Sequence, residues 1–329
     1  MITRRHAIAR LSVAAGGAAL LASPHVHAQG YPDRPLRLIT PYAAGGSADA
    51  LARGVAEQMR KALGQPVVVD NKPGANTAVG AQLTAAAAPD GYTLLICTGS
   101  TVVTNPLLYP KLSYNPERDL APVARIAVSP LVVSVNRALP VQTFADLIRL
   151  AKAQPGKLNY ASTGTGSVLH LASLFLEAQA GLDMTHIPFN GSSPALVAVM
   201  AGEVQLFIDS IASSLPQIKG GKLRALAVTT PDRLQVLPDI PTVAESGFPG
   251  FDVSAWYGIM APAKTPPDVI ARLNAAIGKG LVDKAFREQF EAVGLVIPPV
   301  SSPQAYGDYI RQERDKWGPI IKAKKITLE

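Results

Sequence analysis

The chain has 329 residues, of which 48% are hydrophobic and 17% are charged, so it can bury the cores of about two domains and is not disordered. One cysteine, Cys97, excludes an internal disulfide framework, a cysteine-based zinc cluster and a CxxC redox motif. The net charge of +7 would suit nucleic acid or a membrane surface, but aromatic residues, which stack on bases, make up only 6% of the chain.

The first 28 residues have the pattern of an export signal. Arg4 and Arg5 precede an uncharged apolar stretch, residues 11–22, which is shorter than the roughly 20 residues that a membrane-spanning helix needs. Small residues at the two positions that a signal peptidase reads, Val26 and Ala28, predict cleavage after Ala28. We therefore expect export to a bacterial periplasm, and the sequence leaves the Sec and twin-arginine routes open.

Removing this segment changes the charge and the capacity to bind metal. It contains three arginines and no acidic residue, so the remainder has 28 basic and 24 acidic residues and a net charge of +4. Of the five histidines only His170 and His186 stay, which excludes a three-histidine metal site. The basic residues do not cluster, so we expect neither nucleic-acid binding nor a bound metal or cofactor.

Short apolar runs alternate with small-residue loops and amphipathic helices after the signal. Leu51, Val55 and Met59 recur at helical spacing on one face of the first helix. The β-branched run of residues 67–69 predicts a strand in a sheet that is buried on both sides. This part of the chain is predicted to form strands at 36–40, 67–69 and 92–97 and helices at 48–63 and 79–87.

The same alternation resumes after a proline-rich interval. Thr143 is the expected N-cap of a helix that begins at Phe144. Further strands are predicted at 131–135, 160–161, 186–189, 204–208 and 223–229, and helices at 144–153, 168–178, 195–201, 267–282, 284–293 and 303–322. Strands that alternate with helices indicate an α/β fold with mostly parallel sheets, and two such clusters around a break near residues 125–130 indicate two lobes.

The junctions between strands and helices are the predicted binding region. Ligands of open α/β sheets bind beyond the carboxyl ends of the strands. Here these junctions carry glycine, serine, threonine and asparagine, and helix N-termini add unsatisfied N–H donors and a positive dipole end. Any single loop of this kind can be an ordinary turn with a helix cap. Their recurrence at most junctions favours a carboxylate site without charged side chains.

Catalytic and nucleotide-binding motifs are incomplete. Residues 164–169 begin like a dinucleotide fingerprint but have leucine at the third glycine position, and residues 220–222 lack the upstream glycine of a P-loop. The chain has no GxSxG nucleophile elbow. A secreted serine hydrolase that uses Ser167 and His170 stays an alternative, although a histidine on a helix face more often packs or caps than acts as a base.

Two carboxylates lie at informative junctions. Asp49 is in the first turn of a helix, where it complements the helix dipole or contacts the ligand, and the sequence leaves both roles open. Asp209 ends a strand, where it would cap a helix, bind an ammonium or hydroxyl group of the ligand, or hold a water molecule. Cys97 and His186 are expected to be structural.

Several motifs, in this order, resemble one family. They are residues 31–35 (YPDRP), 41–49 (PYAAGGSAD), 70–76 (DNKPGAN), 88–94 (APDGYTL), 220–228 (GGKLRALAV), 237–245 (LPDIPTVAE), 256–258 (WYG) and 261–262 (AP). Together they are similar to the tripartite tricarboxylate transporter substrate-binding proteins, also called TctC or Bug receptors. The resemblance covers essentially the whole chain after the signal.

The resemblance implies a two-lobed, type II-like periplasmic-binding-protein fold with a cleft between the lobes and a hinge of two crossing strands. The signal peptide would be residues 1–28, the first lobe residues 29–127 and 254–329, and the second lobe residues 128–253. Residues carried over to the ligand site by the resemblance are Tyr42, Ala44, Gly45, Ser47, Asp49, Asn76, Ser100, Thr163, Gly166, Ser167, Asn190 and Asp209.

The implied function is an extracytoplasmic receptor, not an enzyme, that acts as a monomer. It would bind a small carboxylate and deliver it to a tripartite tricarboxylate-type membrane permease. The family often has Tyr-Lys where this chain has Phe189 and Asn190, which argues against a highly anionic ligand such as citrate. A periplasmic sensor for a membrane kinase would share the same binding chemistry and stays an alternative.

Overall fold

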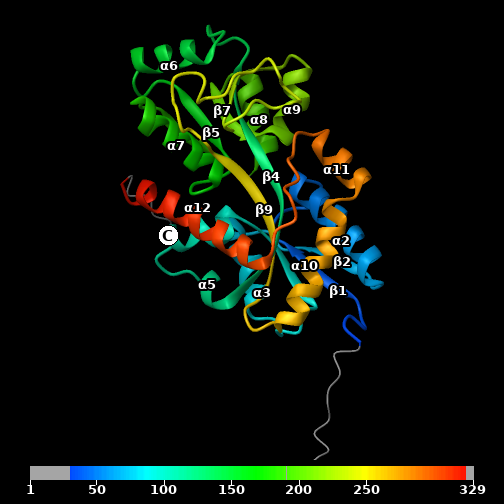
Figure 1. The fold of residues 1–329 in the computed structure, drawn as a ribbon. Helices are drawn as coiled ribbons and strands as arrows, with labels where there is room; N and C mark the ends of the chain where they lie inside the picture. The colour runs from blue at the N-terminus through cyan, green and yellow to red at the C-terminus, as the bar shows by residue number, and fades with distance from the viewer. Residues whose placement is uncertain (1–29, 190, 324–329) are drawn as a thin grey trace, which may run out of the picture. The chain divides into compact units, whose positions relative to one another are not determined.

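The computed structural model describes residues 30–189 and 191–323 (Figure 1). The predicted signal peptide and Asn190 lie outside the described residues. The chain divides into residues up to Asp33 and one large unit from Arg34 onward, and the elements below belong to that unit. Among the described residues, no helix combines the length and the apolar character needed to cross a membrane.

The first set of elements is a parallel sheet with helices. Strand β1 pairs in parallel with both β2 and β3. The three predicted apolar positions of α2 are all buried. The bounds are β1 (Leu36–Thr40), α2 (Ser47–Leu63), β2 (Val67–Asn71), the short helix η1 (Ala75–Thr77), α3 (Ala78–Ala85), β3 (Thr93–Thr98), the π-helical turn η2 (Ser100–Thr104), α4 (Asn105–Leu108) and α5 (Pro116–Asp119).

The second set repeats this arrangement. Its bounds are α6 (Phe144–Ala153), β5 (Asn159–Ser162), α7 (Val168–Ala180), β6 (Thr185–Pro188), α8 (Ser192–Ala201), β7 (Leu206–Ser210), α9 (Ile211–Lys219) and β8 (Leu223–Val228). Strand β5 pairs in parallel with β6 and β7. The predicted N-cap is confirmed: Thr143 Oγ1 accepts from the backbone N–H of Asp146 at 3.1 Å, and the Asp146 carboxylate accepts in return from that of Thr143 at 3.0 Å.

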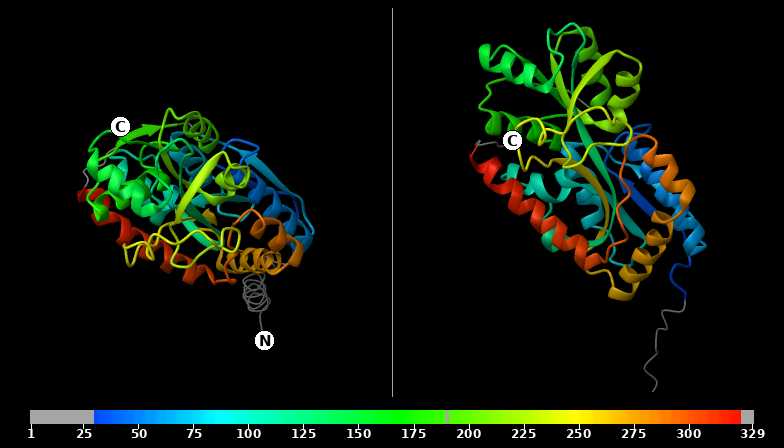
Figure 2. Two further views of the ribbon diagram at one scale, coloured as in Figure 1. Left: turned by 90° about the horizontal axis from the view of Figure 1, so that it is seen from above. Right: turned by 45° about the horizontal axis from the view of Figure 1, so that its top comes forward.

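Two long strands join the sets, β4 (Leu120–Asn136) and β9 (Ser254–Pro262). Strand β9 is antiparallel to β3 and to the first part of β4, whereas the second part of β4 is antiparallel to β7 and β8. The described strands thus form a nine-stranded sheet in the order β2-β1-β3-β9-β4-β7-β5-β6, with β8 on β4. We call the elements around β1–β3 the first lobe and those around β5–β8 the second lobe. Figures 1 and 2 show β4 and β9 running between them.

Strand β4 runs without interruption through residues 125–130, where the sequence places the boundary between the two clusters. Pro130 is the last residue of β4 that pairs with β9, and pairing with β7 begins at Leu131. Proline lacks the N–H of a ladder hydrogen bond, so it falls where the strand changes partner. Pro130 therefore marks an exchange of partners within one strand.

The prediction that residues 67–69 lie in a doubly buried strand is also wrong. Strand β2 is at the edge of the sheet, and Val68 is 56% exposed. A β-branched run favours a strand in either position, so it does not distinguish an edge from a centre.

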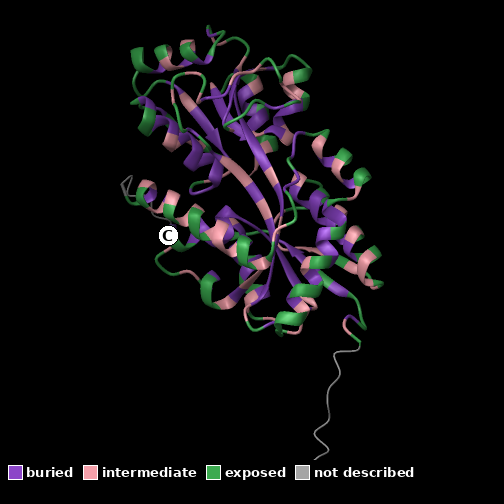
Figure 3. Ribbon diagram, in the orientation of Figure 1, coloured by how far each residue is buried: buried purple, intermediate pink, exposed green. Residues whose placement is uncertain are grey.

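Three C-terminal helices return to the first lobe: α10 (Pro267–Leu281), α11 (Lys284–Glu291) and α12 (Pro303–Ala323). Helix α10 packs on α2, and α12 packs on β4. A side chain at Gly280 would overlap that of Gln58, so this glycine permits the close approach of α10 to α2. The strands of both lobes are mostly buried, and the outward faces of the helices are exposed (Figure 3).

Candidate functional site

The loop between β1 and α2 is organised by Asp49, which is 4% exposed. Its Oδ2 accepts from Gly45 N and Arg53 Nε, both at 3.0 Å, and its Oδ1 accepts from Arg53 Nη2 at 3.1 Å and Asn71 Nδ2 at 3.0 Å. Burial by itself would raise the pKa of Asp49, but these hydrogen bonds outweigh it and lower the pKa to about 2. Asp49 is therefore an ionised group that shapes the loop.

These contacts determine which polar groups of the loop between β1 and α2 have no protein partner and could contact a ligand. The Gly45 N–H points at Asp49, with the glycine at a φ of +85°. Asn71 Nδ2 also donates to the Tyr42 carbonyl at 3.0 Å, and the Tyr42 hydroxyl lies 2.9 Å from Thr98 Oγ1. Ser47 begins α2, whose first N–H groups have no acceptor within the helix.

Asn76 lies in a strained turn after β2. Ala75, Asn76 and Thr77 have φ values of 44°, 47° and 78°, a conformation that costs of order 1–3 kcal/mol for each non-glycine residue. Asn105 stabilises the turn, because the Asn76 amide donates to Asn105 Oδ1 at 2.9 Å and the Asn105 amide donates to the Asn76 carbonyl at 2.7 Å. Thr101 Oγ1 donates to Thr77 Oγ1 at 2.9 Å.

Ser100 begins η2, directly after β3, and is 6% exposed. π-helical turns are rare and often occur at functional sites. The contacts of Thr101 and Asn105 join this turn to the strained turn at Asn76, so the second and third predicted loops form one assembly.

The loop between β5 and α7 contains Thr163, Gly166 and Ser167. Ser167 Oγ caps α7 by accepting from His170 N at 3.2 Å, while His170 Nδ1 accepts from Gly166 N at 3.1 Å. Within the described residues no hydrogen bond joins the His170 ring to the Ser167 hydroxyl. In place of the pairing that a serine hydrolase would need, Ser167 caps the helix and the His170 ring binds the loop at Gly166.

His170 belongs to a buried aromatic stack. Its ring lies 4.0 Å from that of His186, and the His186 ring lies 5.1 Å from that of Tyr160. His186 Nε2 is 2.6 Å from Ser162 Oγ. Burial, with a smaller effect of His186, lowers the pKa of His170 to about 3, so the ring is neutral at ordinary pH.

Asp209 is fully buried near the end of β7. Its carboxylate accepts from Ser192 Oγ at 2.6 Å and from Ser214 Oγ at 2.9 Å. Burial raises the pKa of Asp209 to about 6, although the two serines act in the opposite direction. Ser192 is the first residue of α8 and Ser214 lies in α9, so Asp209 ties the two helices to the strand.

The structure brings several of these loops together across the lobes. Thr104 Oγ1 of η2 donates to the Gly166 carbonyl at 3.2 Å, and a Cβ at Gly99 would lie 3.4 Å from Val168 Cγ2. Burial raises the pKa of Tyr257, on β9, to about 12, and the nearby Asp209 adds to this rise. Burial also raises the pKa of Tyr42, and Tyr257 adds to that rise. Of the other predicted residues, Ser47 and Thr163 make no side-chain hydrogen bond within the described part of the chain, and Ala44 has no polar side chain.

Four residues that hold these loops were not predicted as part of the site: Arg53, Asn71, Thr104 and Asn105. Arg53 follows Asp49 by four residues on one helix face, a spacing that could have identified the pair. The other three make contacts between distant segments, which no local spacing reveals.

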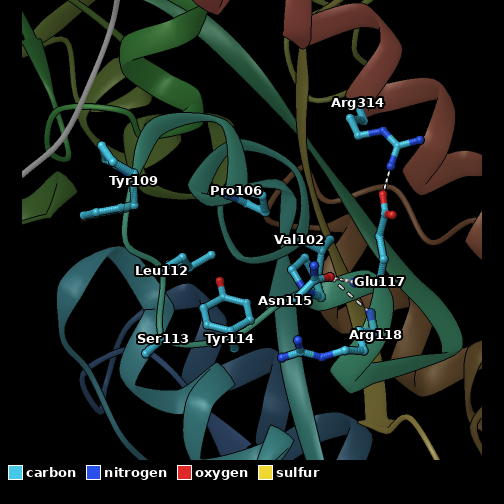
Figure 4. Close-up of a pocket in the computed structure, with 12 residues that line it drawn as sticks. Val102, Pro106, Tyr109, Leu112, Ser113, Tyr114, Asn115, Glu117, Arg118 and Arg314 are labelled. Carbon is cyan, nitrogen blue, oxygen red and sulfur yellow. Dashed lines mark hydrogen bonds and ion pairs between the residues drawn. The ribbon is translucent and has the colours of Figure 1, made fainter.

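A separate pocket of about 460 Å³ lies beside η2 (Figure 4). Tyr114 lines it and donates a hydrogen bond to the Thr101 carbonyl, and Glu117 pairs with Arg314 at its rim. None of the predicted ligand-binding residues lines this pocket. Among the described residues, no group of three or more His, Cys, Asp or Glu side chains could hold a metal ion.

Two α/β lobes joined by a pair of long strands, with polar loops meeting at the strand ends, define a periplasmic solute-binding protein. Residues 51–326 match the model of the tripartite tricarboxylate transporter family receptor, TctC, and the chain belongs to this family. This confirms the resemblance and the fold class expected from the sequence.

Relatives of known structure or sequence agree along almost the whole chain. BugT of Bordetella pertussis is 37% identical over 329 residues, 100% of this chain and 99% of that protein. A Rhodopseudomonas palustris protein solved with adipate is 34% identical, with a TM-score of 0.85 over 90% of this chain and 99% of that one. MatC from the same organism, solved with malate, is 33% identical, with a TM-score of 0.80 over 88% and 99%.

Proposed function

We propose that this protein is an extracytoplasmic receptor that binds one small organic carboxylate between its lobes and delivers it to a two-component permease of the tripartite tricarboxylate type. The observation that carries the proposal is the meeting of η2 from the first lobe with the β5–α7 loop of the second, at Thr104 and Gly166. The relatives solved with adipate and malate support this ligand class.

The ligand carboxylate would be held by uncharged donors. The polar groups of Gly45, Asp49, Gly166 and Asp209 already bind protein partners, so we assign them to holding the loops. The available donors are the first N–H groups of α2 and α7 and the hydroxyl groups of Ser47, Ser100 and Thr163. A mono- or dicarboxylate fits such a site better than a tricarboxylate, because the donors carry no full positive charge.

The remaining features of the sequence agree with this role. Residues 1–28 would direct export to the periplasm and be cleaved after Ala28. The lobes would comprise residues 29–127 with 254–329, and residues 128–253, so that β4 and β9 form the hinge. We expect a monomer without a catalytic activity of its own.

A thermal-shift screen of organic acids tests the proposal. Malate, adipate and monocarboxylates are compared with their uncharged methyl esters, and a ligand at 100 times its Kd adds about 2.7 kcal/mol of stability. We expect at least one free acid, and none of the esters, to raise Tm by several degrees. The matched variants are Ser100→Ala, which removes an available donor, and Ser173→Ala, which removes a buried hydroxyl bonded within α7. If no acid raises Tm, or if the esters act equally, the carboxylate assignment is wrong.

A further inference from the structure

A chain of two hydrogen bonds runs from His170 to the opposite lobe. His170 Nδ1 accepts from Gly166 N at 3.1 Å, and the Gly166 carbonyl accepts from Thr104 Oγ1 at 3.2 Å. His170 and Gly166 belong to the second lobe, and Thr104 is the last residue of η2 in the first. Thr104 is fully buried and His170 is 5% exposed, so water does not readily replace either contact.

The acceptor role of His170 requires one form of its ring. Nδ1 must lack a proton to accept the Gly166 N–H, which leaves the neutral ring with its proton on Nε2. Stacking on His186 and burial beside Tyr160 hold the ring in this orientation. The ring is thus both neutral and fixed in direction.

Gly166 takes part in both hydrogen bonds, through its N–H to His170 and through its carbonyl to Thr104. Its φ is +77°, a conformation that glycine adopts at little cost and other residues avoid. The peptide groups on its two sides are held separately, because Ser167 N, in the same peptide as the Gly166 carbonyl, donates to the Gly164 carbonyl at 3.1 Å, and Gly166 N donates to His170. The His170 contact is therefore one of two restraints that direct the Gly166 carbonyl toward Thr104.

We propose that His170 is a positioning residue for lobe closure: it holds Gly166 so that the Gly166 carbonyl accepts from Thr104 and the closed arrangement is favoured. The hydrogen bond between Thr104 and Gly166 is a property of the protein without ligand. Its consequence for affinity rests on the proposed function, because closure would enclose the carboxylate beside Ser100 and Thr163.

The test uses four single variants of the protein, together with the double variant His170→Leu/Thr104→Val. His170→Leu removes the acceptor, and His170→Asn restores one, because the amide Oδ1 is bonded to Cγ as Nδ1 is. Thr104→Val removes the donor with little change in shape, and Thr84→Val is its matched control, since the buried Thr84 hydroxyl bonds only the Gly80 carbonyl within α3. Circular dichroism and Tm establish that each variant is folded.

Two measurements need no ligand. Hydrogen exchange of the Gly166 amide should accelerate about fivefold or more in His170→Leu and stay near the wild-type rate in His170→Asn. Small-angle scattering should show a larger radius of gyration for His170→Leu and for Thr104→Val, with no further increase in the double variant. Wild-type values are expected for Thr84→Val.

Affinity for malate or adipate, measured by calorimetry, supplies a third readout, in which His170→Leu and Thr104→Val should each raise Kd about fivefold. If neither acid binds the wild type, the choice of ligand fails, but exchange and scattering still decide the role of His170. The proposal is overturned if His170→Asn behaves like His170→Leu, or if Thr104→Val leaves the radius of gyration at the wild-type value.

Discussion

At the scale of single residues, the buried carboxylates Asp49 and Asp209 hold neighbouring segments of the chain together. Asp49 binds Gly45, Arg53 and Asn71, and Asp209 binds Ser192 and Ser214. The pKa values of the two carboxylates shift in opposite directions. Hydrogen-bond donors around Asp49 lower its pKa, whereas burial dominates at Asp209 and raises its pKa. Each carboxylate therefore makes a different prediction.

Replacement of Asp49 should loosen the first loop. Asp49→Asn removes the charge that binds Arg53 and leaves one amide oxygen for several donors, so we expect a loss of about 2 kcal/mol of unfolding free energy. Urea denaturation at pH 7 measures this loss. Glu57→Gln breaks an exposed ion pair with Arg60 on the same helix and should leave the midpoint unchanged. Equal midpoints for both variants would contradict the role of Asp49.

The pH dependence of stability should identify Asp209. Its pKa is about 6 in the folded protein against 3.8 for an ordinary aspartate, so between these values the folded state binds a proton that the unfolded state does not. Stability from this group is complete below pH 3.8 and falls as pH rises to about 6, by at most about 1.4 kcal/mol per pH unit.

Asp209→Asn should abolish that loss, because the amide stays neutral while it can still accept from Ser192 or Ser214. Urea midpoints of the variant and the wild type, taken at intervals from pH 4 to pH 7, measure the difference. A wild-type slope retained in Asp209→Asn would assign the pH dependence to other groups.

At the scale of elements, the sequence predicted features that depend on neighbouring residues, such as helix starts, and did not predict strand pairing between distant segments. Helix α6 begins at its predicted residue because Thr143 and Asp146 form a capping box within four residues. Of β4 only residues 131–135 were predicted as a strand, and β9 was not predicted, because the pairing of β4 with β9 joins residues more than 100 positions apart. The edge position of β2 is likewise set by which strand lies beside it.

In the candidate site, too, local features were predicted from the sequence and contacts between distant segments were not. Glycine, serine and threonine at the strand ends mark the loops in the sequence, but the partners of those loops come from other segments. Asn71 reaches Tyr42, Asn105 reaches Asn76, and Thr104 reaches Gly166. Residue types could therefore be predicted from the sequence, whereas the groups left free for a ligand could not.

The packing of α12 on β9 makes a prediction at this scale. A Cβ at Gly258 would overlap the phenol of Tyr306, which also lies 3.1 Å from Cys97 Sγ, so neither the strand nor the ring can shift easily. Gly258→Ala should cost about 1–3 kcal/mol and lower Tm. Gly318→Ala is the control, because a Cβ there meets nothing within 4 Å in α12 and alanine favours a helix. A Gly258→Ala variant as stable as Gly318→Ala would show that the contact yields.

At the scale of the whole molecule, more than the two long strands connects the lobes. Val128 and Val296 exchange two backbone hydrogen bonds of 2.8 Å, and a Cβ at Gly294 would lie 2.7 Å from Ile211 Cγ2 of the second lobe. The segment between α11 and α12 therefore follows the hinge and contacts both lobes. Helix α12 adds a further contact, because the Trp317 ring lies 6.2 Å from that of Phe175 in α7.

The two tryptophans of the chain should report lobe movement differently. Trp256 packs on Tyr306 and Tyr309 of the first lobe, with ring distances of 5.9 and 5.5 Å, so its surroundings move with it. Trp317 contacts Phe175 across the lobes, so closure changes its surroundings. We expect malate or adipate to change the fluorescence of Trp256→Phe as in the wild type and to have little effect on that of Trp317→Phe. Phe175→Leu, which keeps both indoles, should also reduce the change. A full response from Trp317→Phe would show that the signal comes from Trp256 and would contradict the prediction.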